Sequence, residues 1–124
     1  MKTVRKAVVT AAGRGTRQFP ATRALQKELM PLVDRDGISK PTIQIIFEEC
    51  LESGIEDICV IVEKGGEGRF REHFSKLAES ELASFKGKEW AIKQAEMLER
   101  ISESITYVEQ PSPEGYGHAV FHSN

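Results

Sequence analysis

The residues with the clearest chemical potential form a short loop after an apolar run, Gly13-Arg14-Gly15-Thr16-Arg17-Gln18. Small residues let backbone N–H groups converge on an anion, and Arg17 adds a planar fork of donors. The loop lacks the third glycine of a dinucleotide-binding fingerprint, and no Gly-Lys-Ser/Thr follows at P-loop spacing. It therefore fits an anion site of another kind, or a glycine turn with a purely structural role.

A second glycine-rich segment, residues 111–117, follows another apolar run that ends at Gln110. Both segments come directly after predicted strands. In parallel sheets, ligands bind beyond the carboxyl ends of the strands. The two loops are therefore expected to face one cleft.

Composition limits the classes of protein that the chain can represent. Its 124 residues suit one domain, and 17 basic against 19 acidic residues leave no basic footprint for nucleic acid. Cys50 and Cys59 lie among apolar residues, without metal-ligand spacing or a disulfide framework. No signal-peptide pattern and no membrane-length apolar run occurs. We expect a soluble, cytoplasmic protein with reduced thiols and no membrane contact.

The elements that must position the two loops alternate along the chain. A helix is predicted from Pro41 to Gly54, with apolar residues at Ile43, Ile46, Phe47, Cys50 and Leu51, and one or two more helices from Phe70 to Ile101. Strands are predicted at residues 6–10, 29–34, 58–62 and 105–110, and the opening turns of a helix at 118–124. This order predicts an α/β fold, a three-layer sandwich with a mainly parallel sheet and helices on both faces.

Three short motifs together resemble the opening signature of the sugar-phosphate nucleotidyltransferase family. They are Gly13-Arg14-Gly15-Thr16-Arg17, Pro20-Ala21-Thr22 and Lys27-Glu28-Leu29-Met30-Pro31. The resemblance continues through PTIQIIFEECLESGIEDICVIV, FREHF and VEQPSPEGYGHAV, and so covers nearly the whole chain. The segments FPAT and GYGHAV most resemble the bacterial UTP-glucose-1-phosphate uridylyltransferase branch, and the thymidylyltransferases or other sugar nucleotidyltransferases are the alternative.

The resemblance implies a Rossmann-like nucleotidyltransferase fold and the transfer of UMP from UTP to a sugar 1-phosphate, giving a UDP-sugar and pyrophosphate. Arg17 would hold the β- and γ-phosphates, and Lys27 would neutralise charge at the α-phosphate in the transition state. Without the resemblance, Lys27 would be read as a solvated surface charge. The loop that approaches the nucleotide would comprise Ala12, Gly13, Gly15 and Thr16.

Gln110 is the residue expected to read the base. One carboxamide supplies a donor and an acceptor to the imide edge of uracil, whereas cytosine presents a donor where uracil has O4. Gly115 and Gly117 would allow close backbone approach beside the base and ribose. Without the resemblance, Gln110 is a polar strand end, and the two glycines fit an ordinary turn equally well.

Family members are longer than this chain and depart from it in two ways. They continue into a strand whose final aspartate binds Mg²⁺ and then into the half that binds the sugar phosphate. Residues 1–124 are therefore expected to be a single N-terminal nucleotide-binding part, with Mg²⁺ as the family cofactor and its aspartate ligand outside this part. In addition, Gln26 stands where the family usually has a proline before the lysine.

The family's next strand lies beside the first one, so residues 7–10 are expected to form an apolar sheet edge. Such an edge pairs with a second copy or a complementing chain. This chain alone is expected to be inactive, and a non-catalytic nucleotide-binding fragment or sensor is the alternative function. No catalytic role is expected for His73 or His118, a core position is expected for Trp90 and Met97, and a solvated helix face is expected at Glu96, Glu99 and Glu103.

Overall fold

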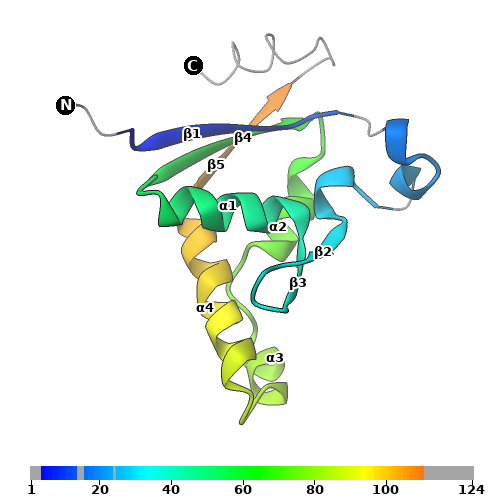
Figure 1. Cartoon of the computed structure of the whole chain (residues 1–124). Coiled ribbons are helices and arrows are strands. Elements are labelled where there is room, and N and C mark those ends of the chain that lie inside the picture. The colour runs from blue at the N-terminus through cyan, green and yellow to red at the C-terminus, as the bar shows by residue number, and fades with distance from the viewer. Residues whose placement is uncertain (1–3, 14–15, 24, 111–124) are drawn as a thin grey trace.

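A computed structural model describes residues 4–13, 16–23 and 25–110 of the chain (Figure 1). Its main sheet is parallel, in the order β1 (Lys6–Ala11), β4 (Asp57–Glu63), β5 (Ile105–Gln110). Lys6 pairs with Asp57, and Ile58 pairs with Ile105. The three apolar runs were thus predicted correctly as strands, and the parallel sheet is confirmed.

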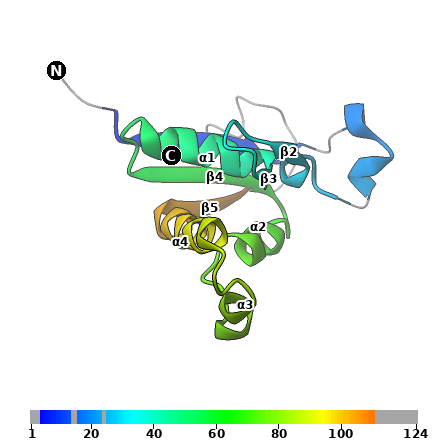
Figure 2. The same ribbon diagram turned by 60° about the horizontal axis from the view of Figure 1, so that its bottom comes forward.

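The central strand β4 is apolar between its first and last residues because side chains on both of its faces are buried. Val60, Ile61 and Val62 are fully buried. Val60 belongs to the larger of two core clusters, on the sheet face against which the helices pack, whereas Ile61 belongs to the smaller cluster on the opposite face. Figures 1 and 2 show α1 and α4 on the same side of the sheet. In the described part of the chain, the helices that contact the core all pack on this one face.

Helix α1 (Thr42–Glu52) begins one residue after its predicted start at Pro41 and ends before Gly54, whose φ of 92° suits glycine. Its buried apolar residues, Ile43, Phe47 and Leu51, follow one another at four-residue intervals and face the sheet. The predicted apolar face was too wide, because Ile46 is 39% exposed.

Three helices, and not one or two, follow β4: α2 (Glu67–His73), α3 (Glu79–Ser84) and α4 (Glu89–Ser104). The helical path breaks at Phe74, where the backbone leaves the helix with φ −92° and ψ 78°. The Phe74 ring lies 5.1 Å from the ring of Phe47 on α1, centroid to centroid. Core packing of Phe74 thus ends α2 although apolar spacing continues along the sequence.

A short antiparallel hairpin, β2 (Pro31–Val33) and β3 (Ser39–Pro41), precedes α1. Residues 34–37 form the turn between the strands, with Gly37 at φ 82°. The predicted strand at 29–34 was too long, since its first residue belongs to the 3-10 helix η3 (Lys27–Leu29). Two further 3-10 turns, η1 (Thr16–Gln18) and η2 (Ala21–Arg23), lie between β1 and η3.

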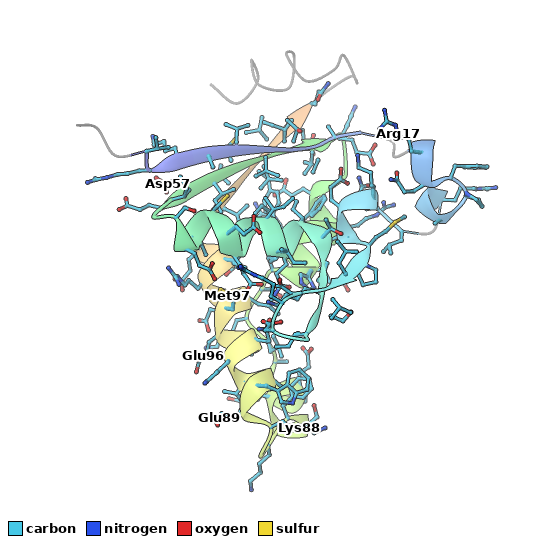
Figure 3. All side chains as sticks on the ribbon, in the orientation of Figure 1. Arg17, Asp57, Lys88, Glu89, Glu96 and Met97 are labelled. Atoms are coloured by element: carbon cyan, nitrogen blue, oxygen red, sulfur yellow. The ribbon has the colours of Figure 1, made fainter. Side chains whose placement is uncertain are left out.

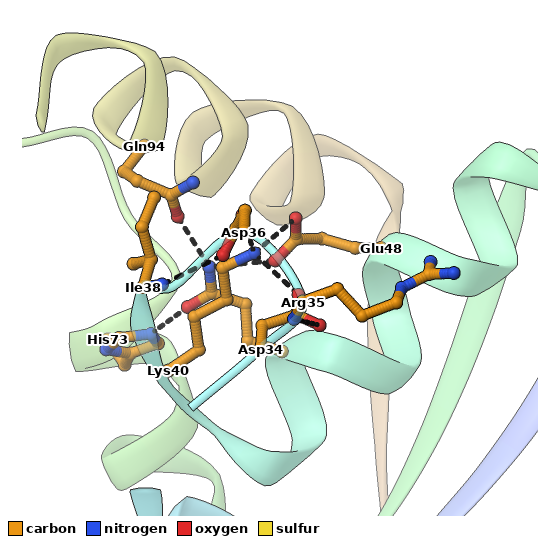
Figure 4. A network of polar contacts seen from close by, with 9 residues as sticks. Asp34, Arg35, Asp36, Ile38, Lys40, Glu48, His73 and Gln94 are labelled. Atoms are coloured by element: carbon orange, nitrogen blue, oxygen red, sulfur yellow. Dashed lines mark hydrogen bonds and ion pairs between the residues drawn. The ribbon is translucent and has the colours of Figure 1, made fainter. Parts of the chain in front are cut away.

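A buried lysine ties this hairpin to α1 (Figure 4). The Lys40 ammonium, 2% exposed, donates to Asp34 and Asp36 at 2.8 Å each and to Glu48 on α1 at 3.1 Å. Burial opposes the charge of Lys40, but the three carboxylates together raise its pKa above the ordinary value. The hydrogen bonds from Lys40 hold the pKa of Asp34 and of Asp36 below the usual range.

The same network runs onward into the helical layer. Gln44 donates to Glu48 and to Gln94 on α4, at 3.1 Å each, and its Oε1 lies 2.9 Å from Nε2 of His73 on α2. Four elements, the hairpin, α1, α2 and α4, are therefore linked through polar side chains as well as through the apolar core.

Cys50 and Cys59 are free thiols, and burial raises the pKa of each above its ordinary value. Among the described residues, none of the helices has the length and apolar character needed to span a membrane.

Candidate nucleotide site

The strand register brings the starts of the two predicted loops to one edge of the sheet. Ala11, the last residue of β1, pairs with Val62, and Gln110, the last residue of β5, pairs with Glu63. The chain therefore leaves β1 and β5 on either side of the end of β4. This is the carboxyl edge at which parallel sheets bind ligands.

Ala12 and Gln110 lie on the same face of the sheet. Ala12 is 7% exposed and packs in one cluster with Ile61 and Val108. Alternate residues of a strand share a face, so Gln110 projects on the side of Val108. This side is opposite the face that α1 and α4 cover. Gln110 is 4% exposed, which suits a residue that fixes one orientation of a ligand.

The start of the glycine-rich loop leaves room for another group. A Cβ built on the exposed Gly13 would meet nothing within 4 Å, so the backbone there is open to close approach. Arg17 is exposed on η1, beyond the carboxyl end of β1 (Figure 3). Gly15, Gly115 and Gly117 lie outside the described residues, as does the predicted start of a helix at 118–124, and the structure places Thr16 as the first residue of η1.

Lys27 opens η3, and its side chain is 45% exposed. Leu29 of the same turn packs against the core. The carbonyl oxygen of Met30 accepts hydrogen bonds from the backbone N–H of Thr42, at 2.9 Å, and from its hydroxyl, at 2.7 Å. Lys27 is thus a partly open cation on a turn that is fixed to the first residue of α1.

The sequence marks Gln26 only as a departure from the family pattern, and sequence reasoning missed Arg69. Gln26 is 7% exposed and donates to Glu28 at 2.7 Å, and Arg69 on α2 donates to Gln26 at 3.5 Å. The sequence shows a glutamine directly before Lys27, but it does not show that this glutamine is buried. The approach of Arg69, 43 positions away, has no sequence signal at all.

Other expectations had mixed outcomes. His73 is a partly buried neighbour of the core, as predicted, and burial lowers its pKa. Met97 packs against the core and Glu96 is exposed, also as predicted. Trp90 was wrongly expected in the core, since it is 56% exposed. It lines a groove of about 300 Å³ beside the N-terminal half of α4, together with Leu77, Phe85 and Leu98.

Comparison with known proteins supports the resemblance. The family model described as "Nucleotidyl transferase" matches residues 6–124. A UTP-glucose-1-phosphate uridylyltransferase of Bacillus subtilis (strain 168) is 43% identical over 98% of this chain. A second one from the same strain, YngB, is 45% identical over 96% of it. The chain spans about two fifths of the length of these relatives, 39% and 38%.

Solved structures agree with the sequence comparison. Apo UDP-glucose pyrophosphorylase superposes with a TM-score of 0.78 at 32% identity, over 97% of this chain and 42% of that structure. The UTP-bound enzyme from Acinetobacter baumannii superposes with a TM-score of 0.71 at 31% identity, over 98% of this chain and 41% of that structure. The α/β fold with a parallel sheet is therefore that of these enzymes, and the chain belongs to the nucleotidyl transferase family.

Proposed function

We propose that residues 1–124 form the UTP-binding part of a UTP-glucose-1-phosphate uridylyltransferase. The observation that carries this proposal is the register that brings the end of β1, with its glycine-rich loop, and the end of β5, with Gln110, to one sheet edge. The reaction joins a phosphate oxygen of the sugar 1-phosphate to the α-phosphorus of UTP. The bond between the α-phosphorus and the bridging oxygen breaks, and pyrophosphate leaves.

Cations and backbone donors supply most of the catalysis in such a transfer, since the protein forms no covalent bond. The open backbone at Gly13 lets the loop approach the triphosphate, and Gly15 and Thr16 continue this cradle. Arg17 binds the β- and γ-phosphates, which leave as pyrophosphate. Lys27, partly exposed on a fixed turn, offsets the charge that develops at the α-phosphate.

Base selection rests on Gln110. Its buried amide donates to one carbonyl of uracil and accepts from the imide N–H. Cytosine presents an amino group and an unprotonated ring nitrogen there, so the same amide orientation leaves buried polar groups unpaired. Gly115 and Gly117 allow the chain after β5 to pass close to the base and ribose.

The described residues do not supply a site for the Mg²⁺ that the family implies. Within the described ranges, no group of three or more Asp, Glu, His or Cys side chains could hold a metal ion.

The outer strand of the sheet is the surface for a macromolecular partner. In the described residues β1 pairs only with β4, and Val8 is 43% exposed. The free backbone groups of β1 pair with a strand from a second copy or from a complementing chain. Sedimentation at micromolar concentration tests this, and a monodisperse monomer contradicts it. The free thiols fit a cytoplasmic protein, and the balance of 17 basic against 19 acidic residues offers no basic footprint for nucleic acid.

Calorimetric titration with UTP and Mg²⁺, and with CTP as the control ligand, tests the binding function. We expect saturable UTP binding and at least about tenfold weaker CTP binding, the cost of one or more unpaired buried polar groups. Lys27→Met should weaken UTP binding, whereas Lys93→Met, an exposed lysine on α4, should not. Absence of UTP binding by the unmodified chain refutes the proposal.

Pyrophosphate release from UTP and glucose 1-phosphate separates an enzyme from a nucleotide-binding module. Release that depends on Lys27 supports the transfer reaction in this chain. UTP binding without release, with release restored by a segment that supplies the sugar-phosphate half, assigns this chain the nucleotide-binding role alone.

A further inference from the structure

Three contacts next to Lys27 indicate how the side chain of that lysine is held in position. On its carboxyl side the turn is already secured, because Leu29 packs in the core and Met30 is hydrogen-bonded to Thr42. On its amino side the chain arrives from the loop that contains η1 and η2. Whatever fixes Lys27 on that side must act through Gln26.

Gln26 has both ends of its side-chain amide engaged although the residue is 7% exposed. Its Nε2 donates to Oε2 of Glu28 at 2.7 Å, and its Oε1 accepts from Nη1 of Arg69 at 3.5 Å. A guanidinium only donates and a carboxylate only accepts. The two partners therefore fit one orientation of the amide and exclude its flip.

The contact with Gln26 also determines which oxygen of Glu28 faces Lys27. Oε2 is engaged by Gln26, and the other oxygen, Oε1, lies 3.9 Å from the Lys27 ammonium. The Glu28 side chain is only 12% exposed, against 45% for Lys27. The largely buried Glu28 carboxylate is thus held in place next to the Lys27 ammonium, and Lys27 remains partly exposed to solvent.

Helix α2 fixes the backbone of Arg69, the residue that donates to Gln26. Arg69 precedes Phe70, which is 1% exposed and belongs to the same core cluster against which Leu29 packs. Helix α2 and η3 are therefore anchored in one core, and the contact between Arg69 and Gln26 joins them outside it.

We propose that Gln26 is a positioning residue for Lys27: clamped by Arg69, it holds Glu28 so that the ammonium of Lys27 stands ready for a triphosphate. This inference rests on the proposed function of Lys27. Gln26 has φ −57° and ψ 135°, values that proline also adopts, so Gln26→Pro removes the amide without changing the backbone.

The test uses Gln26→Ala, Gln26→Pro, Arg69→Ala and the double variant Gln26→Ala/Arg69→Ala, with Arg71→Ala as the matched control on α2. Arg71 pairs with Glu67 and lies over the Tyr107 ring, away from Gln26. Two properties are measured: UTP affinity by calorimetry, and the NMR resonance of the Lys27 ε-CH₂ group in the ligand-free chain, assigned with Lys27→Arg.

Gln26→Ala should weaken UTP binding about tenfold, the equivalent of one charge-assisted hydrogen bond. Arg69→Ala should weaken it less, and the double variant should bind no more weakly than Gln26→Ala alone. Gln26→Pro, which also lacks the amide that contacts Glu28, should weaken UTP binding about as much as Gln26→Ala, whereas Arg71→Ala should stay within about twofold of the unmodified chain. Gln26→Ala and Arg69→Ala should each shift the Lys27 resonance, and Arg71→Ala should not.

Unchanged affinity together with an unshifted Lys27 resonance in Gln26→Ala overturns the inference, and so does additivity in the double variant. If the unmodified chain binds no UTP, the proposed function fails, but the Lys27 resonance still decides whether Gln26 and Arg69 position that side chain. If Gln26→Ala does not fold, Arg69→Ala and Gln26→Pro decide the matter by the same two measurements.

Discussion

Replacing Lys40 with methionine isolates the buried cation that joins the hairpin to α1. Methionine keeps most of the aliphatic stem and removes the ammonium, which is 2% exposed and contacts three carboxylates. In the variant, Glu48, 11% exposed, loses its cation and keeps the hydrogen bond from Gln44. We expect a marked loss of stability.

The size of this loss follows from burial. Breaking a buried ion pair by removing one partner costs about 3–5 kcal/mol, and the partial exposure of Glu48 places Lys40→Met at or below the lower end, about 2–3 kcal/mol. Asp34 and Asp36 lie nearer to solvent, where such pairs are screened. For a chain of 124 residues this corresponds to a fall in Tm of about 10 °C.

Thermal and urea unfolding at several pH values provide the assay, with Lys93→Met as the matched control. The pKa values of Asp34 and Asp36 lie below 3.8 in the folded chain because Lys40 donates to them. Their contribution to stability is therefore present above pH 3.8 and lost as the pH falls below that value. The variant lacks this contribution, so the difference between the two proteins should narrow below about pH 4.

On the alkaline side, the pKa of Lys40 lies above 10.5, so its contribution is complete below pH 10.5 and lost only above it. Between about pH 4 and pH 10 the difference in stability should be constant. A difference under about 1 kcal/mol at pH 7, or one that does not narrow in acid, would refute the account of Lys40 given above.

Three further predictions concern packing and backbone, each measured as the free energy of unfolding in urea. Phe47→Ala should cost about 3–5 kcal/mol, because Phe47 is fully buried; a cost below 1 kcal/mol would contradict its packing. Gly68→Ala should stabilise α2 by about 0.5–1 kcal/mol, since an added Cβ meets nothing within 4 Å. Gly66→Ala should destabilise the folded chain, since its Cβ would lie 3.0 Å from Glu63. Equal changes in the free energy of unfolding for the two variants would contradict this contrast. Tyr107→Phe should be neutral or stabilising by up to about 1 kcal/mol, because the buried hydroxyl has no hydrogen-bond partner among the described residues. Spectrophotometric titration should show the pKa of Tyr107 raised by burial to about 12, and a destabilised variant would contradict the absence of a partner.

The sequence indicates the sheet well because its strands are short, continuous apolar runs. β1, β4 and β5 begin and end within one residue of the ranges predicted for them. The helices after β4 were predicted less well, since apolar spacing passes from Phe70 to Phe85 without interruption and the sequence marks a break only at Gly87. The break at Phe74 comes from its packing on Phe47, a contact between distant parts of the chain.

The hairpin before α1 shows a different limit. The strand β2 lies within the predicted strand at 29–34, although all three of its residues are exposed, whereas β3 was not predicted at all. Its position depends on the ion pairs of Lys40, which composition and periodicity do not reveal. For the candidate site, the strand ends could be predicted, but the face on which Gln110 lies follows from the register alone.

The parallel pairing of β1 also has a consequence for how the chain is made. Lys6 is synthesised early, but its partner Asp57 emerges only after the loop, the hairpin and all of α1. During that interval the apolar strand has no native neighbour, and β4 in turn must wait for β5. Pairings between such distant segments form slowly and leave strand edges exposed meanwhile. A nascent chain of this design is therefore a natural substrate for chaperones that bind extended apolar segments.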